Sequence, residues 1–149
     1  MRSVSWLHTA DLHLGKPIEN WKGSKEEYHI RKEEYRLTFQ RMIDRIKEES
    51  IPFFFIAGDF LEHGYVTCSL YEYIWEQFSR IPDTWIWIAP GNHDPYRMDS
   101  VYRKEKWPHN VHIFGPDWEE HSCSKYDLTV IGRGFSDFHE KERSLPEIK

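Results

Sequence analysis

Cysteine is scarce in this chain of 149 residues, which contains only Cys68 and Cys123. Two widely separated cysteines offer neither a disulfide framework nor the paired spacing of a structural zinc site. No apolar run is long enough to cross a bilayer, and the first residues lack the apolar core of a signal peptide. These absences predict a cytoplasmic protein that makes no contact with a membrane.

Excess positive charge is also absent, since the formal net charge is −5. Such a chain lacks the broad basic field that supports non-specific binding to nucleic acid. Basic residues do gather at Arg97, Arg103, Lys104 and Lys106. They form either a solvated loop or short helix, or a contact to a phosphate backbone. No repeat, low-complexity tract or linker divides the chain, so residues 1–149 are expected to belong to one domain.

Two amphipathic segments predict helices. A capping-box pattern that starts at Ser24 and apolar residues at helical spacing predict a helix over 25–49. Ser69 and Glu72 match a second capping box, for a helix over 67–79 that starts at residue 67 or 69. Each helix is followed by a proline that ends it.

Three short apolar runs, over residues 4–7, 53–57 and 85–89, are typical of buried parallel strands. Alternation with helices predicts an α/β fold, with shorter strands at 111–114 and 128–131. Directly after the three runs come three polar clusters: Asp11-Leu12-His13, Gly58-Asp59 and Gly91-Asn92-His93-Asp94.

These clusters are expected to meet, because the carboxyl ends of parallel strands lie at one edge of a sheet. Each cluster alone is weak, since an Asp-x-His pair at a strand end is more often a hydrogen-bonded pair than a metal site. Their joint occurrence in this order favours a metal-dependent hydrolase.

The three clusters resemble the first three signatures of the calcineurin-like metallophosphoesterases. The stretch His8-Thr9-Ala10-Asp11-Leu12-His13-Leu14-Gly15-Lys16-Pro17 resembles the branch of SbcD-type DNA repair exonucleases, which includes the YhaO-like proteins. The resemblance spans residues 6–135. It implies an α/β sandwich of two sheets flanked by helices, of which this chain supplies an N-terminal portion with the second sheet incomplete.

The resemblance also implies a site with two divalent ions, for which manganese is expected and iron or magnesium are the alternatives. Asp11 and His13 would bind the first ion, Asp59 would bridge both ions, and Asn92 would bind the second. The hydrolysis would use hydroxide activated by two metals held about 3.5–4 Å apart.

Two further residues receive catalytic roles from the resemblance. His93 would act as a general acid that protonates the leaving oxygen, and Glu62 would orient His93. The remaining histidines are interpreted as structural or exposed. His63 is read as an exposed loop residue or a substrate contact. No partner stands at metal-ligand spacing from the four later ones: His109, His112, His121 and His139.

The family completes its dinuclear site with later histidines that residues 1–149 do not contain. This departure predicts that the 149-residue chain alone is weakly active or inactive, and that it is the N-terminal part of a longer enzyme. For the parent, the leading hypothesis is a DNA exonuclease of the SbcD type acting in repair with an SbcC-like ATPase. The alternatives are a phosphomonoesterase or small-nucleotide phosphodiesterase, and a truncated module that binds without catalysis.

Overall fold

The computed structural model describes residues 3–140, and each predicted helix and strand has a counterpart there. In chain order the elements are β1 (Trp6–Thr9), α1 (Lys25–Glu49), β2 (Phe53–Ala57), a 3₁₀ turn (His63–Tyr65), α2 (Cys68–Ser79), β3 (Trp85–Ala89), α3 (Val101–Lys104), β4 (Val111–Ile113), β5 (Glu119–Cys123), a second 3₁₀ turn (Ser124–Tyr126) and β6 (Leu128–Gly132).

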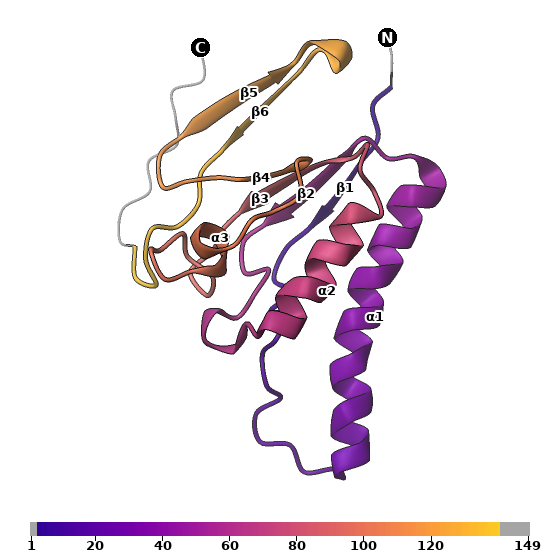
Figure 1. Cartoon of the computed structure of the whole chain (residues 1–149), viewed down its shortest axis with the longest axis vertical. Coiled ribbons are helices and arrows are strands. Elements are labelled where there is room, and N and C mark those ends of the chain that lie inside the picture. Colours follow the sequence, from indigo (N-terminus) through magenta and orange to yellow (C-terminus); the bar gives the residue numbers. More distant parts are fainter. Residues whose placement is uncertain (1–2, 141–149) are drawn as a thin grey trace.

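The main sheet contains four parallel strands in the order β1-β2-β3-β4. Successive strands are neighbours and the crossovers run the same way, so α1 and α2 cover the same face of the sheet (Figure 1). An antiparallel hairpin of β5 and β6 packs on the other face. The fold is therefore a mixed α/β structure with a small second sheet, as predicted.

The first strand differs from its prediction. It covers Trp6–Thr9 instead of 4–7, and it lies at an edge of the described sheet. Trp6 is 60% exposed, and no residue of β1 is fully buried. An apolar run does not distinguish a central strand from an edge strand. The same residue types favour both, and the difference depends on the neighbouring strands.

Helix starts follow side-chain capping. The capping box predicted at Ser24 is confirmed, with Glu27 as its partner. The box predicted for Ser69 and Glu72 is wrong. The hydroxyl of Thr67 caps α2 by accepting the N–H of Leu70 at 3.2 Å, because Thr67 is the last residue with an extended backbone.

Two apolar clusters hold the sheet in place. On the helical side the rings of Phe39, Phe60 and Phe78 lie 5.4–6.0 Å apart between α1, α2 and the sheet. On the hairpin side Trp87 and Phe114 pack against β6. Burial of aromatic side chains on both faces stabilises the sheet, and therefore the positions of its strand ends. Within residues 3–140, no helix has the length and apolar character needed to span a membrane.

Candidate metal centre

The loops after β1 and β2 run side by side and are joined by backbone hydrogen bonds. The N–H of Asp11 donates to the carbonyl of Gly58 at 3.0 Å, and the N–H of His13 donates to that of Asp59 at 2.8 Å. Farther along, Glu62 N–H donates to the carbonyl of Leu14 at 3.1 Å. The polar clusters of the two loops are therefore held at a fixed register beyond the sheet edge.

Left-handed backbone conformations aim the side chains of these loops. Asp11, His13 and Asp59 have φ values of 55°, 46° and 51°, which few non-glycine residues adopt. Such conformations persist only where surrounding contacts impose them, and they concentrate at functional sites. Gly58, with φ at 87°, provides the turn that a side chain would strain.

Three candidate ligands converge at this point. Donor atoms of Asp11, His13 and Asp59 all lie within 4.8 Å of one another. His13 Nε2 is 3.9 Å from Asp11 Oδ1 and 3.8 Å from Asp59 Oδ2. The Asp59 side chain is 13% exposed and that of Asp11 is 75% exposed, so the cluster opens to solvent on one side. Two carboxylates and an imidazole at this spacing fit a divalent cation.

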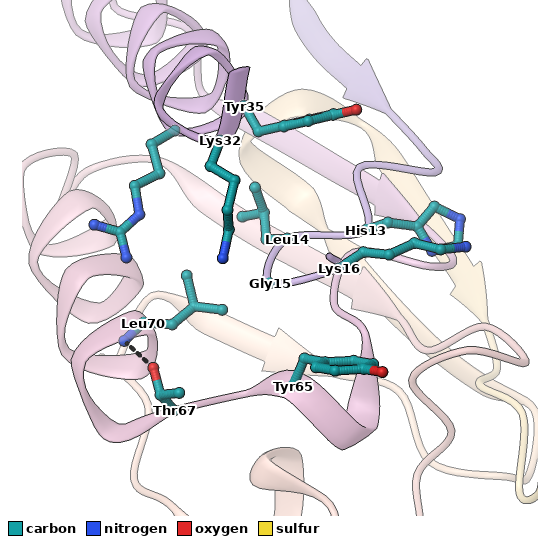
Figure 2. Close-up of a pocket in the computed structure, with 10 residues that line it drawn as sticks. His13, Leu14, Gly15, Lys16, Lys32, Tyr35, Tyr65, Thr67 and Leu70 are labelled. Carbon is teal, nitrogen blue, oxygen red and sulfur yellow. Dashed lines mark hydrogen bonds between the residues drawn. The ribbon is translucent and has the colours of Figure 1, made fainter. Parts of the chain in front are cut away.

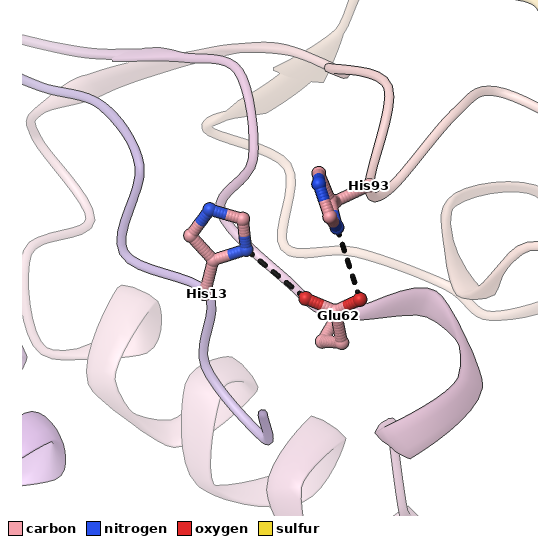
Figure 3. Close-up of side chains that lie close together, drawn as sticks. All are labelled: His13, Glu62 and His93. Atoms are coloured by element: carbon pink, nitrogen blue, oxygen red, sulfur yellow. Dashed lines mark hydrogen bonds and ion pairs between the residues drawn. The ribbon is translucent and has the colours of Figure 1, made fainter. Parts of the chain in front are cut away.

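Glu62 joins the two histidines of the site. One of its oxygens is 3.0 Å from His13 Nδ1 and the other is 3.0 Å from His93 Nδ1 (Figure 3). A carboxylate only accepts, so Nδ1 of each neutral ring carries the proton and each Nε2 keeps its lone pair. The sequence predicted the contact to His93 but not the one to His13. A carboxylate behind a ligating imidazole fixes its tautomer and orientation.

The charge of Glu62 is stabilised where it lies. Burial disfavours the ionised carboxyl, but hydrogen bonds from His93 and His13, together with nearby positive charge, outweigh that effect and hold the pKa of Glu62 below its usual value. Glu62 is therefore an anion at neutral pH and able to accept both hydrogen bonds.

The third loop is fixed by Asp94, whose role sequence reasoning missed. This buried carboxylate accepts hydrogen bonds from the backbone of Asp59, Leu61 and Gly91 and from the hydroxyl of Tyr102, at 2.6–3.1 Å. It therefore ties the loop after β3 to the loop after β2. Asp94 was visible in the sequence as the last residue of the third cluster, but only the tertiary contacts show which backbone groups it binds.

Close contact between these two loops requires glycine at position 91. A Cβ there would lie 2.2 Å from Asp59 Oδ1, which instead accepts the N–H of His93 at 2.9 Å. Asn92 lies exposed between Gly91 and His93, and its side chain has no hydrogen-bond partner among the described residues. Its role as a ligand remains a prediction.

Other predicted features lie outside the cluster. His63 is not an exposed loop residue, because its side chain is 20% exposed and its Nε2 lies 3.5 Å from Asp99 Oδ2. Arg97 is paired with Asp99 and Asp137, and Arg103 and Lys104 lie in the short helix α3. The structure therefore favours the solvated interpretation of this basic segment.

A basic pocket adjoins His13. It lies between the first loop, the middle of α1 and the start of α2, and its lining includes Lys16, Lys32 and Arg36. Figure 2 shows Lys32 extending from α1 towards Gly15, with Tyr65 on the opposite side. Three cationic side chains beside a candidate metal centre favour a negatively charged ligand.

We expect Asp94→Asn to destabilise the protein by about 2 kcal/mol. The amide would replace one accepting oxygen by a donor, which breaks two of the four hydrogen bonds and leaves at least one backbone N–H without an acceptor. Relief of the buried charge offsets part of this cost, since burial raises the pKa of Asp94. Urea unfolding measures the change. Asp83→Asn, at an exposed position, is the control, and equal midpoints for the two variants would contradict the assigned role.

Comparison with known proteins agrees with this geometry. The family model of the calcineurin-like phosphoesterases matches residues 5–146. The uncharacterized metallophosphoesterase YhaO of Bacillus subtilis is 29% identical over 117 residues, which are 76% of this chain and 28% of that protein. The DNA double-strand break repair protein Mre11 of Methanopyrus kandleri is 29% identical over 96 residues, 63% of this chain and 20% of that protein.

The chain thus spans less than a third of the length of either relative. The match to the family model nevertheless includes all three loops of the candidate centre. On that match, and on a fold that agrees with it, the chain belongs to the calcineurin-like phosphoesterase family.

Proposed function

We propose that the protein is a metal-dependent phosphodiesterase that cleaves DNA. The observation that carries the proposal is the convergence of Asp11, His13 and Asp59 beside the His93–Glu62 pair. One of the two relatives is described as a DNA double-strand break repair protein, which supports DNA over other phosphoesters. We further propose that residues 1–149 form the N-terminal part of the catalytic domain, and that an SbcC-like ATPase is its partner.

Divalent ions, with manganese proposed first, would neutralise charge on the phosphoryl oxygens and activate water when bound. In this proposal Asp11 and His13 would hold the first ion, Asn92 would help to hold the second, and Asp59 would contribute to both. Glu62 keeps the His13 imidazole in the tautomer whose Nε2 faces the two aspartates.

His93 is the proposed donor of the proton to the leaving oxygen. Its Nδ1 donates to Glu62, so its Nε2 is the atom that can carry a second proton to the leaving oxygen. The centroid of the His93 ring is also 4.8 Å from that of His13, and the two rings are edge-on. This proximity supports the proposal that the acid acts beside the metal ligands.

Comparison of substrates tests the proposal. In the full-length protein with manganese, single-stranded and duplex DNA should be hydrolysed with a higher kcat/KM than a chromogenic diester or monoester. A preference for the monoester would instead support the phosphomonoesterase alternative, which the acidic net charge favours. No turnover of any of these substrates would support the non-catalytic alternative.

Lys32→Ala should weaken DNA binding selectively. Log affinity falls as log salt rises, and loss of one phosphate contact should reduce the steepness of that fall by about 1. Hydrolysis of the small chromogenic diester should be unchanged. Lys47→Ala, an exposed position on the same helix but outside the pocket lining, is the matched control. Equal behaviour of the two variants in a salt titration would remove the pocket from the DNA path.

A further inference from the structure

A second cluster of metal-ligating side chains lies between β4 and the β5–β6 hairpin. His112 lies in β4 within the cross-strand row Phe55, Trp87 and His112, and β5 carries Glu119 and His121. Residues two apart in a strand point to the same face, so both β5 side chains reach His112. The interpretation that His112 and His121 lack a metal-ligating partner is therefore wrong, because the three side chains come from two different strands.

The donor atoms are close to the spacing of a bound ion. Glu119 Oε2 lies 2.9 Å from His112 Nε2 and 3.3 Å from His121 Nε2, and all three donors lie within 4.8 Å of one another. Ligands about 2.0–2.1 Å from a tetrahedral zinc ion are about 3.3 Å apart. A small widening between His112 and Glu119 is enough to admit the ion.

The carboxylate is already oriented for this role. Its other oxygen accepts the backbone N–H of Gly115 at 2.7 Å, which leaves Oε2 facing both imidazoles. A ligand held by backbone in this way loses little conformational freedom on binding.

Aromatic side chains shelter the cluster without closing it. The Trp87 ring centroid lies 5.0 Å from that of His112 and 4.7 Å from that of His121, and Phe114 is 5.1 Å from His112. The three candidate ligands are 30–35% exposed, so an ion can enter and keep water or another ligand. Apolar walls reduce competition from bulk water for the charged ligands.

We propose that His112, Glu119 and His121 form a second divalent-cation site, suited to zinc, that fastens the hairpin to the main sheet. Two nitrogens and one carboxylate oxygen match zinc coordination. Asp11, His13 and Asp59 have one imidazole and two carboxylates, so oxygen dominates there. The two sites share no residue, and this proposal does not depend on the proposed function.

Zinc binding to a protein with a disabled first centre tests the site. His13→Gln with Asp59→Asn removes two ligands of that centre and one member of the adjoining group of His13, Glu62 and His93. Zinc alone should still bind this background with a stoichiometry of one by calorimetry and elemental analysis. Zinc should also raise its Tm, because an ion that binds only the folded state stabilises it. Adding His112→Gln, Glu119→Gln or His121→Gln should each lower zinc affinity by at least about tenfold.

His109→Gln in the same background is the control, because His109 is exposed and outside the cluster. Circular dichroism establishes that each variant remains folded. Phosphoesterase activity of the His112→Gln protein with an intact first centre should be unchanged. Absence of zinc binding by the background protein would overturn the proposal, as would glutamine variants that bind zinc as tightly as the His109 control; either result would leave only a hydrogen-bonded cluster.

Discussion

Asp59→Asn is expected to lower metal-dependent hydrolysis by about a thousandfold or more. The variant keeps the size of the side chain but removes the negative charge that, in the proposed function, would serve both ions. Asp59 Oδ1 also accepts the N–H of His93, and an amide oxygen can still do so. The loss should therefore come from the metals rather than from a displaced loop.

Two measurements separate these causes. Calorimetric titration with manganese should show a large loss of affinity in Asp59→Asn, whereas urea unfolding without metal should change little. Asp83→Asn removes an equal charge from an exposed position and should match the parent in both. Normal manganese affinity in an inactive Asp59→Asn protein would contradict its role as a ligand.

His93→Ala should lower kcat by about 10²–10⁴-fold while manganese affinity stays within a factor of two or three of the parent value. The reason is that His93 is proposed to be the general acid and not a metal ligand. Its ring is 39% exposed and contacts Glu62, whose other oxygen still supports His13 after the substitution.

The pH dependence of turnover provides the decisive readout. Removal of the acid should abolish the fall in kcat on the alkaline side, because that fall reports loss of the proton from the catalytic group. His109→Ala should keep the parent profile. Equal losses of manganese affinity in His93→Ala and Asp59→Asn would refute the division between ligand and acid.

Local patterns predicted much of the fold. The capping residue Ser24 and apolar residues at helical spacing placed α1 at its observed bounds, and the runs before the second and third clusters placed β2 and β3 at theirs. These features depend on short-range periodicity, which a single sequence carries. The meeting of three loops followed from the rule that parallel strands end at a common edge.

Features that depend on tertiary contacts were missed. Glu62 was matched with His93 alone, although it also supports His13, and Asp94 received no role although it holds two loops together. The histidine pair of β4 and β5 was missed because strand β5 has almost no apolar periodicity: its sequence is EEHSC. Alternation cannot reveal a strand whose inward side chains are themselves polar.

The long separation along the chain between the residues that Glu62 joins has a kinetic consequence. His13 and His93 are 49 and 31 positions away from it, and they meet only after three parallel strands have paired. Such distant pairings form slowly and late in folding. An ion bound by Asp11, His13 and Asp59, whose loops meet at the same stage, would find no preformed site in the folding transition state. It would therefore slow unfolding without accelerating folding. Metal would then stabilise the folded protein kinetically and would not direct its folding.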